Sequence, residues 1–127
     1  MDKIDKHTLH DLISSINQPL LSTHNKLCLP IIRRIYKKMS NGIKFDDIKV
    51  NEQLIIDGHH RYISSLLANV NLNTIKSSKT SATTQYEWNE VEFVDEEWDT
   101  ESKIMRLNEL DAKFNGITLK RIIEIIK

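Results

Sequence analysis

The sequence has little of the features that mark several classes of protein. Cysteine occurs once in 127 residues, so the chain cannot form an internal disulfide and is not a disulfide-stabilised scaffold. The lack of disulfides is typical of a reducing compartment. The single cysteine, Cys28, lies between Leu27 and Leu29 in a short apolar run. We therefore expect it to be a small buried hydrophobic residue and not a reactive thiol.

Long apolar runs and an excess of one charge are also missing. No stretch approaches the roughly 18 apolar residues of a membrane-spanning helix, and residues 1–6 carry no apolar leader segment. These features predict a cytoplasmic protein without a membrane span. Eighteen basic and eighteen acidic residues cancel, which argues against broad electrostatic binding of nucleic acid but leaves a local basic patch open.

The residues that are present fit one globular domain, 1–127. Hydrophobic residues make up 39% of the chain and charged residues 28%, a balance that supports a core and excludes a wholly disordered chain. Apolar residues recur at helical spacing in several stretches. These stretches predict helices over residues 5–16, 31–39, 62–70, 100–114 and 118–126. In the fourth, the apolar face of an amphipathic helix consists of Ile104, Leu107, Leu110 and Phe114.

Shorter apolar runs bounded by turn residues predict strands. They cover residues 26–29, 45–50, 54–56, 74–77 and 88–94. The polar stretch 76–84 predicts a loop, because it has almost no apolar residue to bury. The order of elements predicts an α+β fold, a small mixed sheet with helices. Its core covers about 27–94, with an extra helix before it and a helical extension at about 99–127.

One stretch gathers most of the reactive side chains. The apolar run 54–56 leads directly into five residues at a predicted helix start, and we refer to these as the 57–61 motif. They are Asp57, Gly58, His59, His60 and Arg61. The first amides of a helix point outward and carry partial positive charge, so a helix start is a ready site for an anion. A solvated Asp-Gly turn with a capped helix behind it is the plain alternative.

The residue types of the motif match the needs of phosphoryl chemistry. Such chemistry needs donors to the phosphate oxygens, often a carboxylate for Mg²⁺, and a group that activates the nucleophile. Asp57 is a candidate metal ligand or base, and His59 and His60 are candidate acids, bases or phosphate donors. Gly58 lets a phosphate approach the backbone, and Arg61 can clamp it. Zinc is less well supported, because adjacent histidines rarely point at one ion.

Basic residues on the preceding predicted helix could add to a phosphate site. Arg33 and Arg34 lie there with Lys37 and Lys38. The same residues could instead form the solvated face of a helix that buries its apolar side, and the sequence leaves both interpretations open. His7 and His10 lie three residues apart on the first predicted helix. We expect them on a solvated face, since no further ligands stand near them.

The 57–61 motif resembles that of the ParB/sulfiredoxin-like superfamily. The resemblance runs from about residue 27 to 94, and its centre is an apolar strand, then Gly, a variable pair and Arg at a helix start. Sulfiredoxins have Gly-Cys-His-Arg there, so His60 and Arg61 match while His59 stands at the place of the catalytic cysteine. Chromosome-partition ParB proteins have Gly-Glu-Arg-Arg and continue into a DNA-binding region. Asp-Gly-His-His-Arg is similar to ParB-like nuclease-type domains and free-serine kinases of this fold.

The resemblance implies the function that we expect. It implies binding of a nucleoside triphosphate, ATP or CTP, with Mg²⁺ at the motif, and hydrolysis of phosphoester or phosphoanhydride bonds, as a nuclease or nucleotide hydrolase. It makes sulfinic-acid reduction and centromere reading poor expectations. Two alternatives stay open. One is a non-catalytic interaction protein of a mobile element or of a toxin and its antagonist, with residues 76–84 and the acidic run 95–99 as partner surfaces. The other is a small-molecule kinase.

Overall fold

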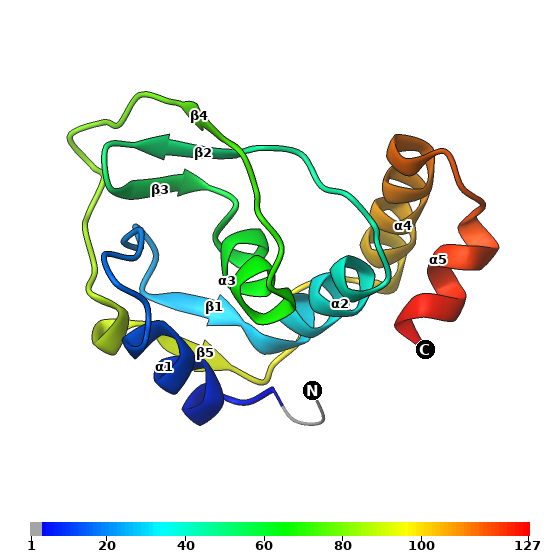
Figure 1. The fold of residues 1–127 in the computed structure, drawn as a ribbon, viewed down its shortest axis with the longest axis horizontal. Helices are drawn as coiled ribbons and strands as arrows, with labels where there is room; N and C mark the ends of the chain where they lie inside the picture. The colour runs from blue at the N-terminus through cyan, green and yellow to red at the C-terminus, as the bar shows by residue number, and fades with distance from the viewer. Residues whose placement is uncertain (1–3) are drawn as a thin grey trace.

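The computed structural model describes residues 4–127 (Figure 1). The prediction that residues 1–6 carry no apolar leader segment falls in part on residues 1–3, which lie outside the described residues. The helices of the described chain begin and end as follows: α1 (Lys6–Ser14), α2 (Leu29–Ser40), α3 (His59–Ala68), α4 (Glu101–Asn115) and α5 (Leu119–Ile126). The strands are β1 (Lys26–Cys28), β2 (Ile48–Asn51), β3 (Leu54–Asp57), β4 (Thr74–Lys76) and β5 (Glu92–Val94), with a 3-10 turn, η1 (Trp88–Glu90). The predicted α+β class is confirmed.

The predicted small mixed sheet is present as a three-stranded sheet, and a second, two-stranded sheet accompanies it in the described residues. One sheet has the order β3-β2-β4, with β2 antiparallel to β3 and parallel to β4. The other pairs β1 with β5 in parallel. Isolated bridges from Leu21 to Leu54 and from Ser22 to Tyr86 lie between the sheets. The chain bends at Thr23 and Asn25, directly after these bridges, and Oγ of Ser22 donates to the carbonyl of His24 across the first bend.

Three predicted boundaries also differ. Leu29 begins α2 and does not end β1, because Pro30 behind it suits a first helical turn. Phe45 lies outside β2. The predicted strand 88–94 is a strand only over β5, since a reciprocal cap between Glu87 and Glu90 closes η1 before it. Trp88 and Val91 are both buried, a spacing of three that suits a 3-10 turn and not a strand.

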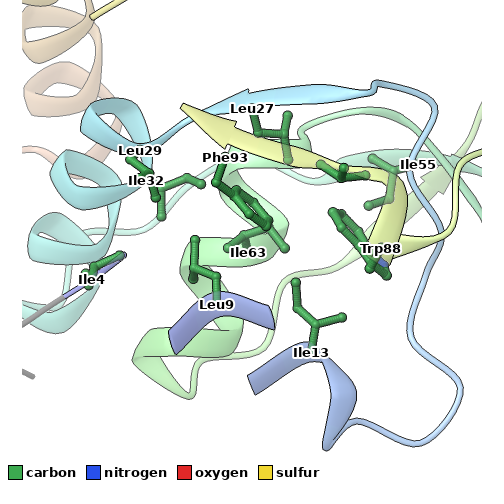
Figure 2. Close-up of a cluster of buried hydrophobic side chains, with 11 residues drawn as sticks. Ile4, Leu9, Ile13, Leu27, Leu29, Ile32, Ile55, Ile63, Trp88 and Phe93 are labelled. Atoms are coloured by element: carbon green, nitrogen blue, oxygen red, sulfur yellow. The ribbon is translucent and has the colours of Figure 1, made fainter. Parts of the chain in front are cut away.

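The main core lies between α1, α2, α3 and the β1-β5 sheet (Figure 2). Its fully buried side chains include Leu9, Leu27, Ile32, Ile55 and Ile63. Trp88 closes one side of this core and satisfies its indole N–H on the carbonyl of Leu20 at 2.6 Å. Cys28 is fully buried, as expected. In this arrangement α3 packs along α2 and also contacts β1 and β2, so the start of α3 lies between the two sheets.

A second apolar cluster joins the C-terminal helices to the end of α2. It consists of Ile43, Ala112, Ile122 and Ile125. The two helices stand together at one end of the molecule in Figure 1, α5 beside α2 and α4 beside α5. None of the helices in residues 4–127 combines the length and apolar character that crossing a membrane requires.

The face that α4 buries differs from its apolar stripe. Asn108 and Ala112 are its buried residues, whereas Leu107, Leu110 and Phe114 are 39%, 50% and 60% exposed. The pattern of residues 100–114 therefore predicted the helix, and Thr100 caps it through the amide of Lys103, but the stripe does not face the core. The helix is confirmed, and it contacts α5 through the face next to this stripe.

Candidate functional site

The 57–61 motif joins the end of β3 to the first turn of α3, so the prediction that it opens a helix is confirmed. Gly58 is the residue that precedes the helix and has φ of +102°, a left-handed conformation that side chains rarely adopt. A Cβ at this position would lie 2.6 Å from Cγ2 of Ile48 and 2.7 Å from Nη2 of Arg61. The turn therefore requires glycine for its conformation and for its space.

The first turn of α3 offers backbone N–H groups to solvent or to a ligand. The amide of Tyr62 is the first with a helical acceptor, the carbonyl of Gly58 at 2.9 Å. The amides of His59, His60 and Arg61 precede it, and no side chain of the described residues caps them. Because the helix dipole adds positive potential at this end, the turn is suited to an anion.

His59 is buried, with 3% of its surface exposed, and its ring is engaged on two sides. Nε2 accepts from the backbone N–H of Thr23 at 3.0 Å, and the ring stacks on His24 with centroids 4.1 Å apart. Burial, and then the neighbouring His24 and His60, lower the pKa of His59 to about 3. The ring is thus neutral at physiological pH, with its lone pair on Nε2 bonded and its proton on Nδ1.

His60 is held in the same way by Cys28, five residues after Thr23. Its Nε2 accepts from the backbone N–H of Cys28 at 3.0 Å, and its ring meets the edge of Trp98. Burial is the main cause that lowers the pKa of His60 to about 4, helped by His24 and opposed by Asp99. Both histidines therefore tie α3 to residues 23–28 as neutral acceptors. The nitrogen that each leaves for a ligand is Nδ1, as an N–H donor.

Arg61, in the first turn of α3, and Asp57, the last residue of β3, face each other loosely. Nη2 of Arg61 is 3.6 Å from Oδ2 of Asp57, beyond a hydrogen bond, and the Asp57 side chain is 67% exposed. Loose pairing leaves the guanidinium able to turn toward an anion. Among the described residues no group of three or more His, Cys, Asp or Glu side chains could hold a metal ion. Asp57 is the one carboxylate of the 57–61 motif, and its side chain is largely exposed.

The motif lines a cleft of about 490 Å³. Its opposite wall comes from α2 and from the start of α4, and includes Ile31, Ile35, Trp98, Asp99, Lys103 and Leu107. Asp99 is paired on both sides, with Lys103 at 3.1 Å and with Arg34 at 3.5 Å. These pairs tie α4 to α2 across the cleft. Lys103 remains 61% exposed and adds a second cation to Arg61.

The structure separates the two arginines that the sequence offered for this site. Arg34 lies beside the cleft, where its guanidinium also binds Glu97 and lowers the pKa of that carboxyl. Arg33 is turned toward the N-terminal segment, donating to the carbonyl of Ile4 at 2.7 Å and lying 3.4 Å from Asp95. Arg33 therefore does not lie at the motif. Arg34 lies beside the cleft, but Glu97 and Asp99 already balance its charge.

Sequence reasoning missed the contribution of residues 98–107. They were assigned to an acidic turn and a helical extension outside the core, yet Trp98, Asp99 and Lys103 line the cleft. The i,i+4 spacing of Asp99 and Lys103 indicates an ion pair at a helix start. No signal in the sequence shows which way that pair faces. His10, expected on a solvated face, packs edge-on against Phe93, whereas His7 is exposed as expected.

No protein-family model, curated protein or solved structure matches this chain. The likeness to the ParB/sulfiredoxin-like superfamily therefore rests on the 57–61 motif and the order of its flanking elements.

Proposed function

We propose that this protein binds a nucleoside triphosphate, ATP or CTP, with its phosphates at the first turn of α3. The observation that carries the proposal is an uncapped helix start, built on Gly58, that opens into a cleft beside the loosely paired Arg61. Backbone amides and a dipole favour negative charge there, and Arg61 can contact two phosphate oxygens at once.

The remaining groups of the cleft fit the same ligand. Lys103, exposed on the facing helix and paired with Asp99, supplies a second cation, and the Nδ1–H groups of neutral His59 and His60 can donate to oxygen. Neutral donors suit a crowded phosphate site because they need no counter-charge. Ile31, Ile35 and Leu107 provide apolar wall for the part of the ligand that carries no phosphate.

Hydrolysis of a phosphoanhydride or phosphoester bond would depend on Asp57. Mg²⁺ commonly binds one or two carboxylates together with substrate phosphates and keeps several waters. The exposed carboxylate of Asp57 fits that role, or that of orienting a water molecule. We assign the step to Asp57 and not to the histidines, because a backbone amide engages Nε2 of each ring and the low pKa values leave the rings without the second proton that a general acid would transfer.

Calorimetry with ATP and CTP, with and without Mg²⁺, tests the proposal. Wild-type protein should bind at least one of them, and Arg61→Ala should bind at least tenfold more weakly, since a charge-assisted contact is lost. Arg106→Ala is the matched control, because Arg106 is exposed on α4 and lies outside the lining of the cleft. If wild-type protein shows no heat with either nucleotide, the proposal is wrong.

An interaction protein without catalysis is a second candidate, and the exposed stripe of α4 favours it. Leu107, Leu110 and Phe114 leave apolar surface that binding partners commonly cover. Turnover of nucleotide or nicking of plasmid and RNA, compared between wild type and Asp57→Asn, separates the two. Activity that the substitution abolishes supports an enzyme, and addition of serine as acceptor tests the kinase. Absence of both nucleotide-binding heat and turnover favours the interaction protein over the enzyme.

A further inference from the structure

A second pocket adjoins the cleft, between α2 and α4. It has a volume of about 200 Å³ and shares Ile31, Ile35, Arg61, Asp99 and Leu107 with the cleft. Because the same side chains line both, a ligand with its phosphates at α3 can extend into this pocket without crossing a barrier of backbone. Its remaining lining includes Ile104 and Phe45, so much of its wall is apolar.

Asn108 marks this pocket as different from ordinary packing. It lines the pocket from α4 and is 2% exposed, and its Oδ1 has no hydrogen-bond partner within residues 4–127. No other buried side-chain nitrogen or oxygen of the described chain lacks one. A buried amide oxygen without a partner is unfavourable, and such exceptions in folded proteins call for a cause. A ligand that donates to Asn108 would supply one.

The surrounding charges restrict what that ligand group can be. Lys38 is bonded to Asp111 at 2.6 Å, and Arg34 holds Asp99. Since these ions already compensate one another, the charged side chain left for a ligand is Arg61, which the pocket shares with the cleft and which the phosphates would take. Asn108 is the polar side chain left over, and the walls beside it are apolar. The combination suits a flat, neutral ring with an N–H donor on its edge.

We infer that the pocket between α2 and α4 takes the base of the nucleotide, with Asn108 accepting from an N–H on the edge of the base. The inference rests on the proposed function and names the part of the ligand that the phosphate site leaves unassigned. The carboxamide turns about χ2, a broad torsion in asparagine, to bring Oδ1 toward the ring. Apolar side chains of α2 and α4 then cover the two faces of the ring.

The experiment compares three probes by calorimetry. ATP carries an amino group on its base, purine riboside triphosphate lacks every base N–H donor, and tripolyphosphate has no base. Wild-type protein should bind ATP about tenfold more tightly than purine riboside triphosphate, the loss expected for one hydrogen bond to a buried acceptor. Asn108→Leu should bring the affinity for ATP down to that level and leave tripolyphosphate binding unchanged.

Glu109→Leu is the matched control, an apolar substitution at the exposed neighbouring position of α4. Unfolding of ligand-free Asn108→Leu should occur at or above the wild-type temperature, because the orphaned oxygen is gone. The comparison of the two nucleotides on wild-type protein needs no variant. Equal binding of ATP and purine riboside triphosphate, or full ATP affinity in Asn108→Leu, overturns the inference and leaves the proposed function standing. Absence of binding for all three probes and for CTP overturns the proposed function itself.

Discussion

The roles of His59 and His60 depend on the partners that the folded chain places beside their rings. His59 and His60 lie among charged and exposed neighbours in sequence, where a catalytic role is natural. In the folded chain each Nε2 instead accepts a backbone N–H from a segment more than thirty residues earlier, as the sequence separations of 36 and 32 show. The rings hold the bend before β1 and remain neutral. In the function that we propose, the amides, Arg61 and the Nδ1–H groups would bind the phosphates.

The low pKa values of these rings predict a loss of stability in acid. Their values are about 3 and about 4, against 6.5 for a free histidine. Above pH 6.5 both states hold neutral rings, so the histidines add no pH dependence. Below it the unfolded chain takes up protons that the folded chain refuses until about pH 4. The free energy of unfolding should fall by up to about 1.4 kcal/mol per pH unit for each histidine.

Urea unfolding at pH 7, 6 and 5 measures this dependence. His60→Gln, which keeps an acceptor oxygen for the amide of Cys28, should flatten the curve between pH 6.5 and 5. His7→Gln is the matched control, the same substitution at an exposed histidine. A wild-type free energy that stays constant from pH 6.5 to 5 would show that the rings are not held neutral.

Gly58→Ala should destabilise the protein and weaken binding at the same time. The substitution forces a side chain into positive φ and against Ile48 and Arg61, at a cost of about 2 kcal/mol. It also displaces the Arg61 guanidinium. Gly116→Ala is the matched control, since Gly116 has a φ of +64° and open space around it. Its cost should be about 1 kcal/mol, without change in nucleotide affinity. Denaturant unfolding and calorimetry measure both variants.

At the scale of elements, ion pairs hold α4 in place across the pockets. Lys38 of α2 is 4% exposed and meets Asp111 of α4 at 2.6 Å, while Arg34 and Lys103 share Asp99. The side-chain amide of Asn115 also donates a hydrogen bond to the carbonyl of Lys44 at 3.0 Å. These contacts, with the apolar cluster at α5, set the width of the cleft because they determine where α4 stands relative to α2.

Lys38→Met should therefore destabilise the fold by about 3 kcal/mol, because it leaves Asp111 without its partner in a mostly buried position. The double variant Lys38→Met/Asp111→Leu should recover most of that loss, since no unpaired charge remains. Denaturant unfolding of the single and double variants gives the coupling energy. A double variant less stable than Lys38→Met would show that the pair contributes more than mutual compensation.

At the scale of the whole molecule, two apolar clusters of different kinds divide the chain. The main core joins α1, α2, α3 and the β1-β5 sheet, and the smaller cluster holds α4 and α5 against the end of α2. The cleft lies where these two parts meet. This position is common for ligand sites, because each part can shape one wall.

The arrangement of α4 predicts which apolar residues carry stability. Phe114→Ser should change the free energy of unfolding by less than about 0.5 kcal/mol, since the side chain is 60% exposed. Ile122→Ala, at a fully buried position of α5, should cost about 3 kcal/mol. Denaturant unfolding of both variants measures these changes in the free energy of unfolding. A large loss in Phe114→Ser, with little in Ile122→Ala, would mean that α4 buries its apolar stripe after all.

The sequence by itself determined what depends on residues close together in the chain. Helical spacing located all five helices of the described chain to within a few residues, and Asp5, Thr100 and Thr118 cap three of them through an amide three residues on. The tight turn from strand to helix at Gly58 was predicted for the same reason, whereas its positive φ and its lack of space for a side chain appear only in the structure. These effects act within one turn, so local pattern carries them.

Only the tertiary structure decided where distant parts meet. In the folded chain the backbone N–H groups of Thr23 and Cys28 donate to the motif histidines. Arg33 binds the carbonyl of Ile4 away from the motif, and Asp99 and Lys103 line the cleft. It also chose which face of α4 is buried. The physical reason is that burial of apolar surface is not directional, so an amphipathic pattern shows that a helix must pack but not against what. The partners of polar groups follow from that packing, and with them the chemistry that the motif can perform.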